Sequence, residues 1–205
     1  MLVIFDLDGV LVKASWNKLF EAYKNLIAAD GKDWKDFFID ISEFKKFWSP
    51  DWNENNKKLR LKNVDVCHQI FYETYDGIDA GLFSWAPKII SQISKKHQLA
   101  ICTNRHGEKA KILIKPISKY FSCVIGGENV KRLKPNPEGI CMILDILKIK
   151  TKDVLMIGDM PADIIAGRAA GIKTGVVKWG LGDWDELMTY SPDYAFKKHE
   201  HLLKI

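Results

Sequence analysis

Two carboxylates stand two residues apart directly after the first apolar run of the chain. Residues 2–5 are apolar and are followed by Asp6 and Asp8. Such a run predicts a buried β-strand, and parallel α/β sheets bind ligands at the carboxyl ends of their strands. Carboxylates in this position can attack an electrophile, transfer a proton or bind a divalent cation. Because Asp is also a common turn residue, the pair alone favours a functional site only slightly over a turn.

Groups with complementary chemistry lie at the ends of later predicted elements. A hydroxyl, an amide and a guanidinium follow the apolar run 99–102, and these groups can hold phosphate oxygens. A lysine precedes a predicted helix that begins at 137 and supplies a compact cation. Two further carboxylates follow the apolar run 154–157. These side chains belong to Thr103, Asn104, Arg105, Lys134, Asp159 and Asp163. Together with the first pair they suit a phosphate site.

Alternating apolar and amphipathic segments predict the elements that position these groups. The expected strands cover 2–5, 99–103, 123–125, 154–157 and 174–177. The expected helices between them cover 86–96, 107–114, 137–147 and 161–170. Strands that alternate with helices are typical of a parallel sheet. The sequence therefore predicts a Rossmann-like α/β core, with helices on both faces of a parallel sheet.

The long interval between the first two predicted strands has a different character. It contains no convincing strand and much helical periodicity, which predicts an all-helical subdomain at 14–85 inserted into an α/β core formed by 1–13 and 86–205. Five of the seven tryptophans fall in this interval or at its edge, as expected if a small helical unit builds its core from large side chains. Trp48 and Trp52 are the candidates for a second role, as the lining of a substrate pocket.

Three helices are expected within the inserted segment. The first begins after Ser15, a good N-cap, and ends at Asp30 and Gly31. The second is expected over 34–47 and the third over 64–75.

The composition is typical of an ordinary globular protein. The 205 residues are 47% hydrophobic and 28% charged, and the net charge is +5. The cations are scattered in short clusters, so no nucleic-acid partner is expected. No apolar run is long enough to span a bilayer, and the first residues do not have the pattern of a signal peptide. We therefore expect a cytoplasmic protein without membrane contact. The four cysteines lack the spacing of a zinc site.

In their order along the chain, the polar segments resemble the four sequence motifs of the haloacid dehalogenase superfamily of phosphohydrolases. The motifs are Asp-x-Asp-Gly-Val from Asp6, Thr-Asn at Thr103, Lys-Pro at Lys134 and Gly-Asp-x-x-x-Asp from Gly158. Each is weak alone, but four in the correct order are hard to obtain by chance. The resemblance covers nearly the whole chain apart from the inserted helices. It implies a phosphoric monoester hydrolase that requires Mg²⁺ and acts on a small-molecule phosphate ester.

The resemblance also implies roles for the carboxylates. Asp6 would be the nucleophile that forms an aspartyl-phosphate, and Asp8 would protonate the leaving group and then activate water. Asp6, Asp159 and Asp8, the last through its backbone carbonyl, would bind Mg²⁺. Asp163 would support the metal site or orient the lysine.

The remaining groups would hold the phosphoryl group. Thr103 and Lys134 would bind its non-bridging oxygens, with the backbone amides of Leu7 and Asn104 as further candidates. The side chains of Asn104 and Arg105 are candidate substrate contacts. For Arg105, a surface salt bridge is about as good an explanation.

The helical insertion resembles the mobile cap of the phosphoglycolate phosphatase-like branch, which closes over the site and selects the leaving group. The substrate would then be a small phosphorylated metabolite, either phosphoglycolate-like or a sugar phosphate. Lys13 departs from the pattern of this branch, in which an acidic residue often precedes the Ser that corresponds to Ser15. The basic residues that could select the substrate are Lys57, Lys58, Arg60 and Lys62.

Three alternatives stay open. A β-phosphoglucomutase-like mutase carries the same Asp-x-Asp-Gly-Val segment. A phosphoaspartate signalling domain also combines acids, a Thr and a Lys on a parallel sheet, although it lacks a long helical insertion. A catalytically silent binding scaffold is the third. The glycine pairs at 126–127 and 180–182 lack the spacing of a nucleotide fingerprint and are interpreted as turns. The oligomeric state is not predicted.

Overall fold

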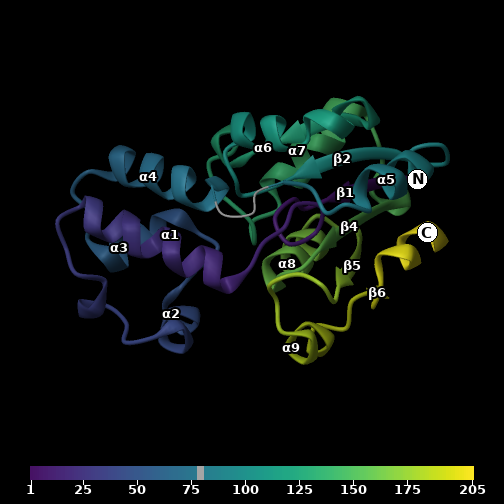
Figure 1. Ribbon diagram of the computed structural model, residues 1–205. Coiled ribbons are helices and arrows are strands. Elements are labelled where there is room, and N and C mark those ends of the chain that lie inside the picture. Colours follow the sequence, from purple (N-terminus) through teal and green to yellow (C-terminus); the bar gives the residue numbers. More distant parts are fainter. Residues whose placement is uncertain (78–80) are drawn as a thin grey trace. The chain divides into compact units, whose positions relative to one another are not determined.

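The computed structural model describes residues 1–77 and 81–205 and divides the chain into two compact units (Figure 1). One unit combines Met1–Lys13 with Gly81–Ile205, and the other is Ala14–Ala80. The two segments that connect the units are held together by backbone hydrogen bonds within the first unit. Val12 forms an antiparallel bridge with Leu82, and the Phe83 amide donates a 2.9 Å hydrogen bond to the Leu11 carbonyl. The role of the helical unit as a cap stays a prediction.

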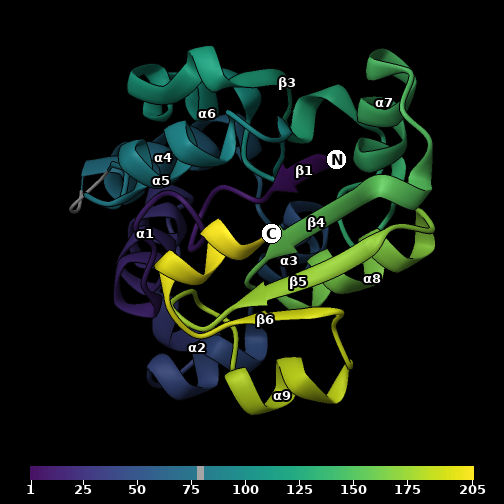
Figure 2. The same ribbon diagram turned by 90° about the vertical axis from the view of Figure 1, so that its right-hand side faces the viewer.

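The first unit is built on a parallel sheet, which among the described residues has six strands in the order β3-β2-β1-β4-β5-β6 (Figure 2). The strands are β1 (Leu2–Phe5), β2 (Gln98–Cys102), β3 (Phe121–Ile125), β4 (Val154–Gly158), β5 (Lys173–Val177) and β6 (Tyr194–Phe196). Each neighbouring pair is parallel. The predicted α/β fold and its five strands are confirmed, with ends shifted by one or two residues. The three-residue β6 was not predicted.

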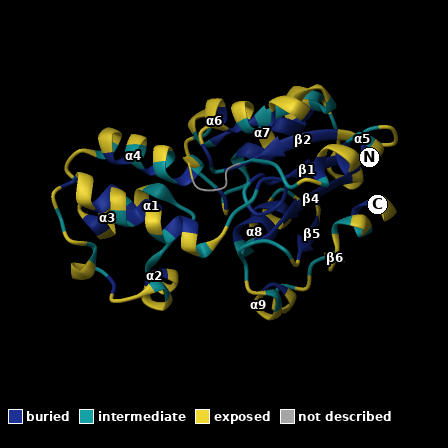
Figure 3. Cartoon of the chain, in the orientation of Figure 1, coloured by how far each residue is buried: buried dark blue, intermediate teal, exposed yellow. Residues whose placement is uncertain are grey.

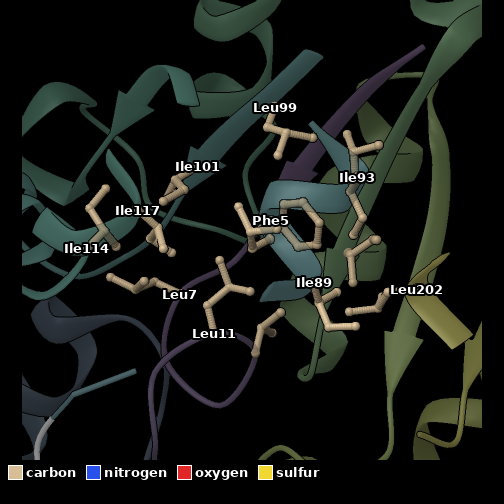
Figure 4. Close-up of a cluster of buried hydrophobic side chains, with 14 of the residues drawn as sticks. Phe5, Leu7, Leu11, Ile89, Ile93, Leu99, Ile101, Ile114, Ile117 and Leu202 are labelled. Atoms are coloured by element: carbon tan, nitrogen blue, oxygen red, sulfur yellow. The ribbon is translucent and has the colours of Figure 1, made fainter. Parts of the chain in front are cut away.

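Helices cover both faces of this sheet because its strands are apolar on both sides. In β1, Val3 and Phe5 pack in one core cluster, and Leu2 and Ile4 pack in another. The first cluster lies under α5 (Ala86–Ile93) and α6 (Gly107–Leu113) and is drawn in Figure 4. The second lies under α7 (Glu138–Leu147) and α8 (Pro161–Ala169). The central strands β1 and β4 are accordingly buried along their length (Figure 3). Such continuous apolar strands are what a sheet covered on both faces requires.

The four predicted core helices are confirmed, and shorter elements complete the unit. Among these, α9 (Trp184–Thr189) was not predicted; it begins where the Asp183 carboxylate accepts a hydrogen bond from the Glu186 amide. The short 3-10 helices are η2 (Lys115–Tyr120), η3 (Gly127–Asn129), η4 (Thr151–Asp153) and η5 (His199–Lys204).

The second unit is helical, as predicted, but its segmentation differs from the prediction. Its elements are α1 (Trp16–Ala29), η1 (Trp34–Asp36), α2 (Ile41–Phe47), α3 (Trp52–Leu59) and α4 (Val64–Gly77). The first and third predicted helices are confirmed as α1 and α4. The single helix expected over 34–47 is wrong, because the Asp40 carboxylate accepts from the Ser42 and Glu43 amides and starts α2 there. α3 was not predicted.

Aromatic side chains form the core of the helical unit. Tyr23, Phe44 and Phe71 are buried, and the Tyr23 ring contacts each of the other two. Trp48 and Trp52 pack against this cluster, and Trp52 stacks on Tyr23 with ring centroids 6.0 Å apart. Their packing agrees with the core interpretation of the tryptophans. None of the described helices combines the length and apolarity needed to cross a membrane.

Candidate active site

The carboxyl edge of the sheet gathers most of the polar residues singled out in the sequence. Asp6 follows β1, Thr103 follows β2 and Asp159 follows β4, and β1 lies between β2 and β4. Lys134 comes from the loop that precedes α7, and Asp163 from the first turn of α8. All five are buried, although polar side chains are normally exposed. Parallel strands bring their carboxyl ends to one edge, so residues far apart in sequence meet there.

Lys134 connects two of the carboxylates. Its Nζ lies 2.9 Å from Asp6 Oδ1 and 2.6 Å from Asp163 Oδ1. Burial alone would lower the pKa of the Lys134 ammonium, but the charges of Asp163 and Asp6 raise it above its usual value. Lys134 is therefore a permanent cation within the site.

Burial dominates the electrostatics of Asp6 and Asp159. Burial, opposed by the charge of Lys134, raises the pKa of Asp6 to about 7. Burial, together with the charges of Asp6 and Asp163, raises the pKa of Asp159 well above its usual value. The charge of Lys134 therefore compensates these carboxylates only in part.

The site fits a divalent cation. Oxygens of Asp6, Asp159 and Asp163 lie within 4.8 Å of one another. Within the part of the chain that the structure describes, the buried oxygens Asp6 Oδ1 and Asp159 Oδ1 accept no well-formed hydrogen bond, although the Lys134 ammonium lies 2.9 Å from the former. Buried oxygens normally have a partner, and hard cations such as Mg²⁺ bind carboxylate oxygens. Asp6 and Asp159 are thus the residues with an oxygen to offer.

Asp163 is fully engaged by protein groups. Its Oδ1 accepts from Lys134, while its Oδ2 accepts from the backbone amides of Asp159 (3.1 Å) and Met160 (3.0 Å). Gly158 makes room for it, since a Cβ there would lie 2.1 Å from Asp163 Cγ. Asp163 therefore fixes both the lysine and the turn that carries Asp159.

Asp159 sits in a cradle of glycines that the sequence analysis did not identify. The backbone amide of Leu181 donates a 2.7 Å hydrogen bond to Asp159 Oδ2. A Cβ on Gly180 would lie 2.2 Å from Asp159 Cβ, and one on Gly182 would lie 2.0 Å from the Asp159 carbonyl oxygen. Gly9, at φ +77°, approaches the same carboxylate from the first loop. The interpretation of 180–182 as a mere turn was incomplete; a Gly-x-Gly after a predicted strand is a sign of close backbone approach.

Asp8 lies apart from this carboxylate cluster and is paired with an arginine. Its Oδ2 accepts from Arg105 Nε at 2.8 Å, and its Oδ1 accepts from Arg105 Nη2 at 2.9 Å. No motif in the sequence predicts this contact. Arg105 is expected from the sequence to contact substrate or to form a surface ion pair, whereas its side chain is only 3% exposed.

The Asn104 side chain forms two hydrogen bonds to the backbone of Lys134. Its Oδ1 accepts from the Lys134 amide (2.9 Å), and its Nδ2 donates to the Lys134 carbonyl (3.0 Å). A two-bond clamp of this kind fixes the loop from which the lysine side chain starts.

The glycines at 126–127 bring a neighbouring loop against the segment that follows β2. A Cβ on Gly126 would lie 2.3 Å from the Gly107 amide nitrogen, and one on Gly127 would lie 2.6 Å from the Asn104 carbonyl oxygen. Glu128 then accepts a 2.6 Å hydrogen bond from the Gly107 amide at the start of α6. These glycines therefore permit the close packing of the two segments.

Comparisons with known proteins agree with this geometry. The family model of the haloacid dehalogenase-like hydrolases matches residues 3–177. The pyrophosphatase PpaX of Anoxybacillus flavithermus is 37% identical, over 99% of this chain and 95% of its own length. Among solved structures, a haloacid dehalogenase-like family hydrolase from Streptococcus pneumoniae aligns with a TM-score of 0.80 at 23% identity, covering 99% of this chain and 96% of that one. A predicted phosphoglycolate phosphatase from Haemophilus somnus aligns over the same shares with a TM-score of 0.76 at 19% identity.

Proposed function

The chain belongs to the haloacid dehalogenase-like hydrolases, and on this premise we propose that it is a Mg²⁺-dependent phosphatase that acts on a small phosphorylated metabolite through an aspartyl-phosphate on Asp6. One observation carries the proposal. A buried carboxylate at the end of the central strand lies 2.9 Å from a buried lysine and shares its surroundings with a second carboxylate that has an oxygen without a hydrogen bond.

In the first step, an oxygen of Asp6 attacks the phosphorus atom. The bond from phosphorus to the leaving oxygen breaks, the electron pair stays on that oxygen, and a proton from Asp8 neutralises it. Lys134 and the Thr103 hydroxyl stabilise the charge on the non-bridging oxygens. Lys134 is well suited to this task because burial and Asn104 fix its position.

In the second step, Asp8 accepts a proton from water as the water oxygen attacks the phosphorus atom of the aspartyl-phosphate. The bond from phosphorus to Asp6 breaks, so that inorganic phosphate leaves and both carboxylates return to their starting states.

Mg²⁺ would be held by the side chains of Asp6 and Asp159 and by the backbone carbonyl of Asp8. When bound, it supplies positive charge that offsets the repulsion between the carboxylate nucleophile and the phosphate dianion. Asp163 acts indirectly in this scheme, by orienting Lys134 and the turn that carries Asp159. Thr103 contacts the phosphoryl group directly.

Two substrate classes compete. A phosphoglycolate-like ester or a sugar phosphate is the class that the helical insertion favours. Inorganic pyrophosphate is the second, because the relative from Anoxybacillus flavithermus is named a pyrophosphatase and is 37% identical over nearly the full chain. A β-phosphoglucomutase-like mutase stays an alternative, and conversion of a sugar phosphate into its isomer without phosphate release would favour it.

The test is phosphate release from a panel of phosphoglycolate, sugar phosphates and pyrophosphate, with Mg²⁺ and with chelator. We expect release only with the metal, and none from the Asp6→Asn variant. Acid quenching during turnover should leave one phosphoryl group on the peptide that contains Asp6, visible by mass spectrometry. No release by the wild type, or equal release by the variant, would contradict the mechanism. The fastest substrate in the panel decides between ester and pyrophosphate.

A further inference from the structure

The ion pair between Arg105 and Asp8 has a more defined geometry than a surface ion pair. Two parallel N–H groups of one guanidinium face the two oxygens of one carboxylate, at 2.8 and 2.9 Å. The Arg105 side chain is 3% exposed, whereas that of Asp8 is 23% exposed. Bidentate pairs of this geometry fix the plane of the carboxylate as well as its position. The guanidinium thus supports the carboxylate from the protein side.

The backbone of Arg105 is anchored as firmly as its side chain. Its amide donates to the Thr103 hydroxyl at 3.2 Å, and its carbonyl accepts from the Gly127 amide at 2.9 Å. Gly127 must be a glycine for this approach, because a Cβ there would lie 2.6 Å from the Asn104 carbonyl oxygen. An arginine fixed at both ends is a rigid support for Asp8.

We propose that Arg105 is a positioning residue for Asp8, which it holds in the orientation required to give a proton to the leaving oxygen. This inference rests on the proposed function. A carboxylate has about four lone-pair sites, and the two-pronged guanidinium of Arg105, the fork, occupies one on each oxygen. The remaining site on each oxygen is left for a proton and for the substrate. Asp8 delivers its proton as the bond from phosphorus to oxygen breaks, and the electron pair of that bond stays on the leaving oxygen. Because Nε and Nη2 of Arg105 donate to Asp8, this role differs from a direct contact of those two groups with the substrate phosphate.

Leaving-group dependence isolates the role. An alkoxide needs the proton in order to leave, whereas p-nitrophenolate leaves readily without it, so misplacement of Asp8 slows the first step selectively for alkyl esters. This step is measured by kcat/KM, which does not include the hydrolysis of the aspartyl-phosphate that both substrates share. The variants are Arg105→Gln and Arg105→Lys, with Arg132→Gln as the matched control because its side chain is 74% exposed. The substrates are p-nitrophenyl phosphate and the alkyl phosphate that the wild type hydrolyses fastest.

For Arg105→Gln we expect kcat/KM to fall about tenfold or more further on the alkyl phosphate than on p-nitrophenyl phosphate, within the range of general acid catalysis. Arg105→Lys should lie between this variant and the wild type, because an ammonium cannot form the fork. Adding Arg105→Gln to Asp8→Asn should cause no further loss on the alkyl ester. The control should behave as the wild type.

The opposite results would overturn the inference. An equal loss of kcat/KM on both substrates indicates a merely structural role, and a large rise in KM indicates a direct substrate contact. A wild type that hydrolyses p-nitrophenyl phosphate but no alkyl phosphate also counts against it. Circular dichroism checks the fold, and Arg105→Lys supplies the decisive comparison if Arg105→Gln does not fold. A wild type that releases phosphate from no substrate refutes the proposed function itself, which is a different outcome.

Discussion

Lys134 is the residue on which the buried charges of the site depend. It lies within ion-pair distance of Asp6 and Asp163, and all three side chains are buried. A buried charge costs free energy unless an opposite charge and hydrogen bonds compensate it, and removal of one partner leaves the other exposed to that cost. The lysine thus serves the folded state as well as the proposed reaction.

The Lys134→Met variant should lose activity, whereas variants of surface lysines should not. We expect kcat to fall by about 10²–10³, the usual effect of removing one donor to the transition state. Steady-state phosphate release at saturating substrate measures this. Lys131→Met, on an exposed residue of the same loop, is the control and should retain activity. A loss below tenfold for Lys134→Met would show that the lysine does not contact the phosphoryl group.

The sequence identifies residue types at strand ends but not all of their partners. Asp6 and Asp159 were expected at strand ends, which meet at one edge of a parallel sheet, and oxygens of the two lie within 4.8 Å of each other. The partner of Asp8 could not be predicted, since Arg105 is 97 positions away and either residue could have faced solvent. Side-chain direction at a loop depends on packing that no local pattern encodes.

At the scale of elements, the loop after β5 shapes the site through its backbone. Gly180 and Gly182 touch Asp159 where any side chain would collide, and the Leu181 amide holds the carboxylate. This loop is therefore part of the candidate metal site although it contributes no side-chain ligand.

The Gly180→Ala variant tests this loop. A Cβ 2.2 Å from Asp159 Cβ must displace the carboxylate, so we expect Mg²⁺ affinity to fall by about tenfold or more, within the range for groups that orient metal ligands. Isothermal titration with Mg²⁺ measures it without turnover. Gly77→Ala is the control, because nothing lies within 4 Å of a Cβ there. Equal affinities of the two variants would remove the loop from the metal site.

Asp30 ties α1 to the segment that leads into α4. Its carboxylate accepts hydrogen bonds from Lys32 Nζ and from the amides of Lys62 and Asn63. Hydrogen bonding from Lys32, together with the two amides, lowers the pKa of Asp30 to about 2, despite an opposing effect of burial. The ionised carboxylate therefore stabilises the folded state.

Because the folded pKa of Asp30 lies below its usual value, this stabilisation is present above about pH 4 and is lost as the pH falls through 2. We expect Asp30→Asn to lower the free energy of unfolding by about 2 kcal/mol at pH 7, and by less at pH 3. Urea unfolding at the two pH values measures the difference. Asp36→Asn, on an exposed side chain of the same unit, should change little. If the loss of unfolding free energy in Asp30→Asn is as large at pH 3 as at pH 7, the ionised Asp30 carboxylate is not the source of the stabilisation.

Long apolar patterns predicted their elements well, and short capped ones did not. The second predicted helix failed at Asp40, where a cap overrides a periodicity that continues on both sides. α3, α9 and β6 were missed, since α3 is a largely polar segment and the six residues of α9 and three of β6 carry too little periodicity to separate from turns. Caps and brief pairings depend on tertiary contacts that the sequence reveals only locally.

At the scale of the whole molecule, the order of the strands concentrates negative charge at one edge. The alternation of strands and helices predicted a parallel sheet but not the order in which its strands lie. The structure places β1 between β2 and β4, and this brings Asp6 and Asp159 into one buried cluster. The fold therefore accepts a local destabilisation that a bound cation can offset.

This destabilisation has a pH dependence that thermal unfolding can detect. The pKa of Asp6 is raised to about 7 and that of Asp159 is raised well above its usual value, so the folded state holds protons that the unfolded state releases. Without metal, stability is then highest below about pH 4 as far as these groups are concerned, and falls as the pH rises through 7. Mg²⁺ replaces the protons, so it should raise Tm more at pH 8 than at pH 5.5. Asp159→Asn should abolish this Mg²⁺ response, and Asp153→Asn, beside β4 but exposed, should retain it. A Mg²⁺ shift in Tm that is equal at both pH values, or that survives Asp159→Asn, would place the cation elsewhere.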